Sequence, residues 1–191
     1  MALAKRGGDR LKKNIFVIIG SASRNSSNER LVESMAEMIR DECDVTIFND
    51  LKMLPHFDPE QSLENAPQII EEFRARIDQA DGVIICTPEY VFSVPSGLKN
   101  AIEWCVATTV FSDKPIGLIT ASAQGEKGHA ELQLLMKTVM AMFTDDTTLL
   151  IQGIKGKINL HGEIVDNNTQ DEVTRFVDAY KSLIQSQVAA L

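Results

Sequence analysis

The sequence predicts an α/β fold in which a five-stranded parallel sheet is covered by helices on both faces. Short apolar runs alternate along the whole chain with longer segments whose apolar residues recur about every three or four positions. These two patterns are typical of buried strands and of amphipathic helices. Because parallel strands need right-handed crossover connections, strict strand–helix alternation without repeats or low-complexity linkers predicts a doubly wound sheet.

Each strand is expected where a short apolar run lies between turn residues. The runs cover residues 14–19, 45–48, 82–87, 115–120 and 147–151. The segment 50–65 has no clear period and contains Pro55 and Pro59, so we expect a long irregular loop there.

Helices are expected in the intervals between the strands. Their apolar faces are formed by Leu31, Met35 and Ile39; by Ile69, Ile70, Phe73, Ile77 and Ala80; by the stretch 98–104; by Leu132, Leu135, Met136, Val139 and Met140; and by Val173, Phe176, Val177, Tyr180, Leu183 and Ile184. Pro67 suits the first turn of the second helix. Thr169 and Glu172 have the spacing of a capping box and predict the start of the last helix.

The composition is that of one soluble domain. The chain has 191 residues, 44% apolar and 24% charged, and a net charge of −8, so it can bury a core without cross-links. Residues 1–13 carry five basic groups against one acid, and we expect them to be a disordered basic tail before a single domain at 14–191. The acidic body argues against nucleic acid as a partner.

Other composition features point to the cytoplasm. No segment reaches the roughly 18 apolar residues of a membrane helix, and no secretory apolar region follows the basic start. The cysteines, Cys43, Cys86 and Cys105, lack a CxxC spacing and predict free thiols in a reducing compartment. The three histidines lie far apart in the sequence, so no metal site is expected.

A polar loop after the first strand is the first candidate binding site. Residues 20–28 read GSASRNSSN and run into the first predicted helix. Helix starts bind phosphate through unpaired amides and a partial positive charge. The loop has neither the Gly-Lys-Ser/Thr ending of a Walker A motif nor the GxGxxG fingerprint. The candidate phosphate contacts are Ser21, Ser23, Arg24, Ser26, Ser27 and Asn28. The alternative is an ordinary serine-rich turn in which Ser26 and Glu29 form a capping box.

The segment 87–104, TPEYVFSVPSGLKNAIEW, is the second candidate. It leaves the carboxyl end of the third strand, where open α/β sheets bind ligands. Pro88, Pro95 and Gly97 shape a tight loop, and Tyr90 and Phe92 offer flat apolar surfaces. A loop with rings and backbone amides suits a planar heterocycle with polar edges.

Together the two loops resemble the signatures of the NADPH-dependent FMN reductase family, which includes quinone, azo and chromate reductases. In the family's GSxRxxSxN loop, Ser21, Ser26 and Asn28 fall in register, whereas Arg24 lies one place late and Ser23 takes the arginine's place. Residues 88–104 resemble PEYN…P(G)xLKNAxDW, with Val91 at the position of the asparagine.

The alternation alone allows a strand order of 3-2-1-4-5-6 or of 2-1-3-4-5. Only the second makes strands one and three neighbours, so that their loops converge on one ligand. We therefore predict a flavodoxin-like sheet of order 2-1-3-4-5.

The resemblance also implies the cofactor and its contacts. FMN would place its phosphate in the first loop and its isoalloxazine edge along Pro88, Glu89, Tyr90 and Val91, with Phe92 beside it. Ser122 and the turn at Gly125 would approach from the fourth strand, although Lys127 replaces a usual glycine of that loop. No catalytic side chain is expected, because a flavin carries the chemistry itself.

The resulting prediction is an enzyme that passes a hydride from NADPH, or NADH, through bound FMN to a small-molecule acceptor. Quinones, azo compounds, metal oxyanions and free flavin are the acceptor classes that the resemblance implies. It also implies a homodimer or homotetramer, with the loop 55–61 and the helix 99–104 as interface pieces. The alternatives are a flavodoxin-type electron carrier without NAD(P)H activity, and a binding module without catalysis.

Overall fold

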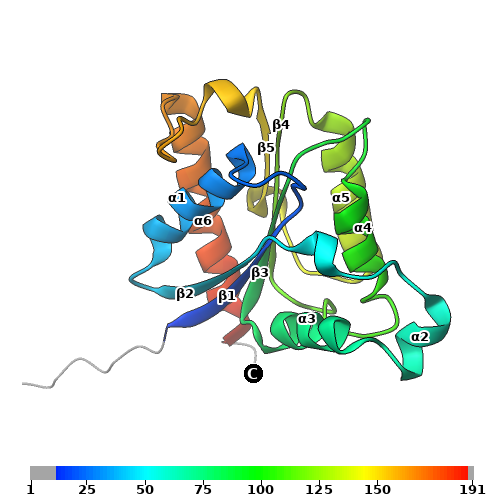
Figure 1. Ribbon diagram of the computed structural model, residues 1–191. Coiled ribbons are helices and arrows are strands. Elements are labelled where there is room, and N and C mark those ends of the chain that lie inside the picture. Colours follow the sequence, from blue (N-terminus) through cyan, green and yellow to red (C-terminus); the bar gives the residue numbers. More distant parts are fainter. Residues whose placement is uncertain (1–11, 189–191) are drawn as a thin grey trace, which may run out of the picture.

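A computed structural model describes residues 12–188 and shows one parallel sheet between two layers of helices (Figure 1). The strand order is β2-β1-β3-β4-β5, which confirms the predicted flavodoxin-like order. The strands are β1 Lys13–Ile19, β2 Cys43–Phe48, β3 Gly82–Thr87, β4 Ile116–Ser122 and β5 Thr148–Gln152. Ile19 is paired with Cys86, and Thr87 with Thr120, so β1, β3 and β4 end together at one edge of the sheet.

The two faces of the sheet are covered by different helices (Figure 1). The helices α1 Ser27–Ile39 and α6 Asn167–Val188 pack on one face. The helices α3 Gln68–Gln79, α4 Ser96–Glu103 and α5 Glu126–Thr138 pack on the other. Successive side chains of a strand point to opposite faces. Accordingly, Phe16 and Ile18 belong to the core under α3, α4 and α5, while Ile15 and Val17 belong to the core under α1 and α6.

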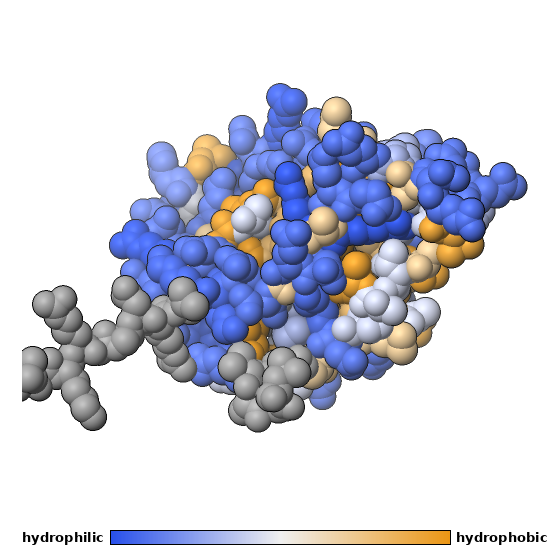
Figure 2. Space-filling view, turned by 90° about the horizontal axis from the view of Figure 1, so that it is seen from below, coloured by the Kyte–Doolittle hydropathy of each residue, from blue (hydrophilic) through white to orange (hydrophobic). Residues whose placement is uncertain are grey.

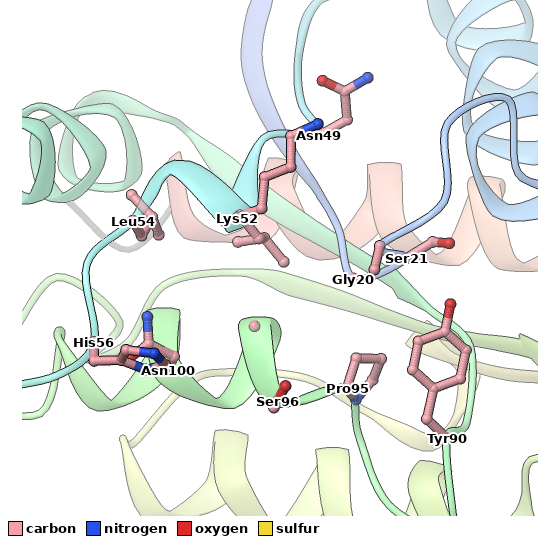
Figure 3. A pocket seen from close by; sticks show the side chains of 13 residues that line it. Gly20, Ser21, Asn49, Lys52, Leu54, His56, Tyr90, Pro95, Ser96 and Asn100 are labelled. Carbon is pink, nitrogen blue, oxygen red and sulfur yellow. The ribbon is translucent and has the colours of Figure 1, made fainter.

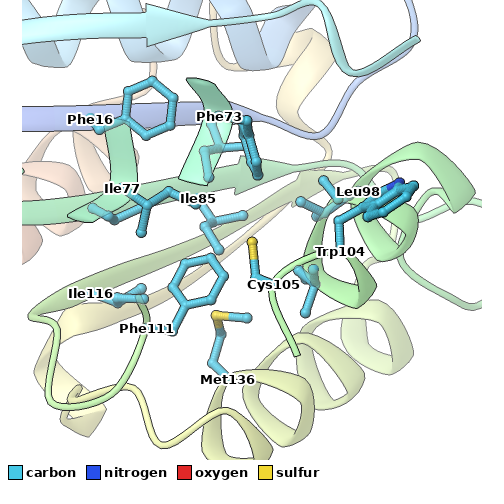
Figure 4. Close-up of a cluster of buried hydrophobic side chains, with 14 of the residues drawn as sticks. Phe16, Phe73, Ile77, Ile85, Leu98, Trp104, Cys105, Phe111, Ile116 and Met136 are labelled. Atoms are coloured by element: carbon cyan, nitrogen blue, oxygen red, sulfur yellow. The ribbon is translucent and has the colours of Figure 1, made fainter. Parts of the chain in front are cut away.

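The core under α3, α4 and α5 contains most of the buried rings (Figure 4). Phe16 and Phe73 meet edge to face with ring centroids 6.0 Å apart. Trp104 is fully buried at the end of α4 and lies beside Leu98 (Figure 4). This packing fixes the position of α4, whose first turn reaches the carboxyl edge of the sheet.

A buried cation, Arg74 of α3, joins three elements beneath this core. Its Nε donates to the carbonyl oxygen of Trp104 at 3.0 Å. Its Nη2 donates to the carbonyl and hydroxyl oxygens of Ser62 at 3.0 and 2.9 Å, and its Nη1 pairs with Glu71 at 2.7 Å. Ser62 belongs to the short helix α2 Pro59–Glu64. Arg74 therefore holds α2 and the end of α4 together.

The segment 50–65 is more regular than its sequence predicts. It contains a 3-10 turn, η1 Leu51–Met53, and the helix α2. Asp58 caps α2 by accepting from the amides of Glu60 and Gln61 at 2.9 and 3.3 Å, and Pro59 occupies the first helical position. Both are preferred at a helix start, but the helix is too short to leave a periodic pattern.

The starts of α6 and of β1 differ from the predicted ones. The helix α6 begins at Asn167, because the carboxylate of Asp166 accepts from the amide and the hydroxyl of Thr169 at 2.9 and 2.6 Å, so Thr169 does not cap it. At the other end of the chain, Lys13 is the first residue of β1, and Lys12 donates to the carbonyl oxygen of Arg40 at 2.6 Å. These two residues of the predicted tail belong to the fold, and residues 1–11 of that tail lie outside the described residues.

The face at the amino ends of the strands is covered mostly by polar side chains, between which apolar residues form small separate groups (Figure 2). Further 3-10 turns, η2 Asp145–Thr147 and η3 Ile154–Gly156, flank β5. Within residues 12–188, none of the helices combines the length and the apolar character that crossing a membrane requires.

Candidate functional site

A pocket of about 360 Å³ opens at the carboxyl edge of the sheet, on the side of α4. This volume lies in the range of small-molecule sites. The pocket is lined by Gly20, Ser21, Ala22, Asn49, Leu51, Lys52, Leu54, His56, Tyr90, Pro95, Ser96, Gly97 and Asn100. Figure 3 shows that three segments surround it: the end of β1, the segment after β2, and Tyr90 with the first turns of α4. It brings together two predicted site residues, Ser21 and Tyr90.

Gly20 allows the loop after β1 to cross the end of β3. Its amide donates to the carbonyl oxygen of Cys86 at 2.8 Å. A Cβ atom at this position would lie 2.2 Å from Oγ1 and 2.6 Å from Cβ of the buried Thr87. The backbone can therefore approach β3 only where residue 20 has no side chain.

The loop 21–28 presents a set of unpaired donors at the start of α1. Ser26 caps the helix by accepting from the amide of Glu29 at 3.1 Å, and Ser21 accepts from the amide of Ser23 at 3.3 Å. Among the described residues, these are the only amides of 21–29 that donate to a protein acceptor. Free amides, serine hydroxyls and the positive end of a helix make a site for an anion.

The capping-box alternative accounts for only half of the geometry. Ser26 does cap α1, but the carboxylate of Glu29 accepts from Nδ2 of Asn49 at 2.7 Å and does not return to Ser26. The remaining donors of the loop are thus left for a ligand.

Asn28 lies inside the protein, with 4% of its surface exposed. Its Nδ2 donates to the carbonyl oxygen of Ala121 at 3.1 Å, and its Oδ1 accepts from Sγ of Cys86 at 3.3 Å. Both ends of the side chain are engaged by β3 and β4, so the amide of Asn28 fixes the helix start against the sheet. The position of Asn28 in the loop motif does not predict that its side chain is buried.

Ser23 and Arg24 are exposed and lie outside the pocket, on a second hollow of about 260 Å³ that shares Asn49 and Lys52 with it. Another cation, Arg30, was not predicted. Its Nη1 donates to the carbonyl oxygen of Asn25 at 2.6 Å and its Nη2 to Oγ of Ser27 at 3.2 Å. Its position one helical turn after the loop is the only sequence signal for this role.

The loop after β3 forms a tight turn at Tyr90–Ser93. The amide of each of these residues donates to the carbonyl oxygen of the other, at 2.9 and 3.0 Å. Val91 and Phe92 have φ angles of 51° and 59°, as in a type I′ turn. Their side chains are 96% and 68% exposed at the tip, whereas Tyr90 lines the pocket.

Replacing Val91 with asparagine is expected to stabilise the protein by about 1 kcal/mol. A β-branched residue at positive φ is strained, and asparagine tolerates this conformation far better. Chemical denaturation of the two proteins measures the difference. Exchanging the exposed Val165 for asparagine serves as the control and should change the stability little. A Val91 variant no more stable than the parent would contradict the strain.

Glu89 joins the loop after β3 to the loop after β4. Its carboxylate oxygens accept from the amides of Gly125 and Gly128 at 3.2 and 2.7 Å. Its carbonyl oxygen accepts from Oγ of Ser122 at 3.4 Å. Glu89 is therefore bonded to two other predicted contacts, Ser122 and Gly125. The fourth, Pro88, is buried, and its carbonyl oxygen accepts from Oγ1 of Thr87 at 3.0 Å.

A second carboxylate, that of Glu131 in α5, holds the same loop at Ser93 and Val94. It accepts from Oγ of Ser93 at 2.6 Å and from the amide of Val94 at 3.0 Å. Its other carboxylate oxygen lies 3.6 Å from Nζ of Lys99. Burial acts to raise the pKa of Glu131, but these bonds and the charge of Lys99 outweigh it and lower the pKa overall. The carboxylate is therefore ionised at neutral pH.

The wall formed by the segment after β2 was not predicted as part of the site. Asn100 holds it by donating to the carbonyl oxygen of Pro55 at 2.9 Å and accepting from the amide of Phe57 at 2.7 Å. Nε1 of Trp104 donates to the same carbonyl at 2.8 Å, and the ring of Phe57 meets the indole edge to face at 5.4 Å. The helix that follows the aromatic loop thus positions Lys52 and His56 at the pocket.

Two further titratable groups near the site, Cys86 and His129, are buried structural residues. Burial raises the pKa of Cys86 far above the ordinary value of a thiol, so it is not a nucleophile. Burial lowers the pKa of His129, whose Nδ1 lies 3.0 Å from Oγ1 of Thr120. Within residues 12–188, no three His, Cys, Asp or Glu side chains are grouped to hold a metal ion.

Comparison with known proteins agrees with this geometry. Residues 13–151 match the NADPH-dependent FMN reductase family. The chain is similar to a quinone reductase of Escherichia coli (strain K12), with 30% identity over 182 residues that cover 91% of this chain and 96% of that one. It is also similar to a 2-hydroxy-1,4-benzoquinone reductase of a Burkholderia species, with 28% identity over 91% of this chain and 97% of that one.

The fold is similar to that of the flavoenzyme NAD(P)H:(acceptor) oxidoreductase of Paracoccus denitrificans. The TM-score is 0.77, the sequence identity is 24%, and the match covers 91% of this chain and 98% of that one.

Proposed function

Because the chain belongs to the NADPH-dependent FMN reductase family, we propose that it uses NAD(P)H and bound FMN to reduce a quinone. One observation carries the proposal: the donor-rich loop 21–28 and the aromatic turn 90–93 leave neighbouring parallel strands at the same edge of the sheet. Ligands of doubly wound sheets bind where the strand order reverses, which here is between β1 and β3.

The described residues fit FMN on two counts. The unpaired amides of Ser26 and Ser27 and the O–H donors of their hydroxyl groups, with Ser21 nearby, supply the donors that a phosphate needs in an otherwise acidic protein. In this proposal the backbone of 88–92 and Ser122 contact the polar edge of the flat ring, and Tyr90, which lines the pocket, adds an aromatic surface. Asn28 and Arg30 hold the phosphate loop in shape from behind.

FMN, when bound, supplies the redox chemistry by accepting a hydride from NAD(P)H and passing two electrons to the acceptor. The protein supplies binding and orientation. Lys52 lies on both hollows and offers a positive charge to an anionic ligand. The exposed side chains of Val91 and Phe92 favour a planar, largely apolar acceptor such as a quinone.

We further propose that the enzyme acts in the cytoplasm as a homodimer or homotetramer. The exposed Met53 and Leu63 lie in the segment 50–65, next to the predicted interface loop 55–61. Light scattering coupled to size-exclusion chromatography measures the assembly directly, and a monomer at micromolar concentration would contradict the proposal.

The function is tested by the visible absorption spectrum of the protein after mixing with FMN and desalting, followed by anaerobic NADPH and then a benzoquinone. Flavin bands that survive desalting, bleach with NADPH and return with the quinone are expected. Bands that persist with both NADPH and NADH would instead indicate an electron carrier. Protein without flavin bands would indicate that the site has lost its cofactor.

Replacing Ser21 and Ser26 together with alanine is expected to weaken FMN binding at least about 100-fold. Each hydrogen bond to a charged group contributes about 1.5–3 kcal/mol. The dissociation constant is measured by fluorescence titration. Ser26 also caps α1, so Asp58→Ala, which removes the cap of α2 at a residue outside the pocket lining, is the control. It should lower the melting temperature but leave the FMN affinity unchanged. Undiminished affinity of the double variant would place the phosphate elsewhere.

A further inference from the structure

The carboxylate of Glu89 accepts hydrogen bonds from the amides of Gly125 and Gly128, and we call this contact the Glu89 bridge. Besides joining two loops, the bridge places a negative charge at the start of α5. We infer that Glu89 makes the site bind oxidised FMN more strongly than reduced FMN, and so sets a low reduction potential for the cofactor. The inference rests on the proposed function, because it requires FMN between the loops after β3 and β4.

The bridge is a close contact between the loop after β3 and the start of α5. The carboxylate lies 2.7 Å from the amide of Gly128 and 3.2 Å from that of Gly125. A Cβ atom on Gly128 would lie only 3.2 Å from Cβ and Cγ of Glu89, so the glutamate stem is packed directly against this glycine. Glu89 is half-buried, and its backbone carbonyl is also held by Ser122. Its carboxylate therefore keeps one position.

That position is the amino end of α5. The first amides of a helix have no partner within the helix, and together they carry about half a positive charge. Gly125 precedes α5 and Gly128 lies in its first turn. With these amides free, the positive end of α5 would face the loop after β3. The carboxylate takes both amides and puts a full negative charge in the same place.

The sign of this charge matters because reduction changes the charge of the cofactor. Hydride transfer oxidises NAD(P)H to NAD(P)⁺ and brings two electrons and one proton into the site, so the site gains one negative charge. A positive helix end would stabilise that charge, as preorganised dipoles do in many enzymes. Glu89 opposes it. The result is a reduced cofactor that gives up its electrons to the acceptor more readily.

Other charges around the first turns of α5 do not duplicate this effect. Glu131 is paired with Lys99 and with two donors of the loop 93–94. Glu126 and Lys127 are exposed to solvent, where their fields are screened. Glu126 is therefore a matched control, since it is a glutamate in the first turn of the same helix without the bridge.

The test is the midpoint potential of bound FMN in the wild type, Glu89→Gln and Glu126→Gln, measured by equilibration with reference dyes. Glu89→Gln is expected to raise the affinity for reduced over oxidised FMN by about threefold to tenfold. A tenfold change corresponds to about 30 mV in a two-electron potential. Glu126→Gln should leave the potential close to the wild-type value. A potential of Glu89→Gln equal to that of Glu126→Gln would overturn the inference.

A second measurement tests the bridge without FMN. Glu89→Ala should speed hydrogen exchange at the amides of Gly125 and Gly128 in the flavin-free protein, and Glu126→Ala should not. Unchanged exchange would show that there is no bridge and would overturn the inference. Wild-type protein that retains no FMN would refute the proposed function and with it the role in the potential. Bound FMN with an unshifted potential would refute the inference alone.

Discussion

Replacing Gly20 with alanine is expected to abolish retention of FMN and to lower the free energy of unfolding by about 3 kcal/mol. The new Cβ would lie 2.2 Å from Oγ1 of Thr87, which is fully buried and held by its own hydrogen bond to the carbonyl oxygen of Pro88. Overpacking a rigid site forces the backbone to shift and costs about 1–3 kcal/mol, and more where relaxation is blocked. The shift would move the whole loop 21–28 away from β3. Urea denaturation and flavin content after desalting measure the two effects.

Gly97→Ala is the matched control for Gly20→Ala. Both glycines line the same pocket, but a Cβ on Gly97 would have its nearest neighbour, Cβ of Leu51, at 3.6 Å, which is ordinary contact. Gly97 also lies in α4, where alanine is the better helix former. Gly97→Ala should therefore fold at least as stably as the parent and keep FMN. If the two variants had the same stability and flavin content, the close contact between residue 20 and Thr87 would not be what requires glycine in this loop.

Replacing Arg74 with methionine is the second change with a large expected effect, a loss of about 3 kcal/mol in the free energy of unfolding. The carbonyl oxygens of Trp104 and Ser62 would lose the donors that Nε and Nη2 provide. Buried acceptors left without partners cost about 1–3 kcal/mol each. The loss of the contact with Trp104 should also loosen the pocket wall at 55–57 and so weaken FMN binding to a smaller degree. Thermal and urea unfolding, with and without FMN, separate the two effects.

Arg76→Met controls for the loss of a positive charge on the same helix. Arg76 is exposed on α3, and surface substitutions usually change stability by less than about 0.5 kcal/mol. If Arg74→Met were as mild as Arg76→Met, the hydrogen bonds to Ser62 and Trp104 would not be holding α2 and α4 together.

The sequence patterns were sufficient for the architecture because each depends on local periods. The buried runs of β1, β3 and β4 predict the strands, whereas their order follows from the two loop motifs, which converge on one ligand only if β1 and β3 are neighbours. The cap at Ser26 follows from its spacing to Glu29 in the same way. The start of α6 is ambiguous in the sequence, because two residues three positions apart could each cap the helix. Thr169 is followed by Glu172 at the capping-box spacing, and Asp166 precedes Thr169 at the same spacing.

The pocket was only partly predictable, because its composition depends on contacts between distant segments. Asn28 occupies the position of a ligand contact in the loop motif, yet its side-chain amide points into the protein, where it is bonded to Ala121 of β4 and Cys86 of β3. Lys52 and His56 reach the pocket only because Asn100, which follows them by more than 40 residues, fixes the path of the segment after β2. No local pattern reports such a contact.

The hydrogen bond between Trp104 and Pro55 has a practical consequence for spectroscopy. Trp104 is the only tryptophan of the chain, and its indole is hydrogen-bonded to the segment that forms the pocket wall and meets Phe57 of that segment edge to face. Its fluorescence is therefore a local signal of this wall and of the end of α4. Emission quenched by energy transfer to FMN, or shifted when the wall opens, would report ligand occupancy in real time, without an added dye or an engineered label.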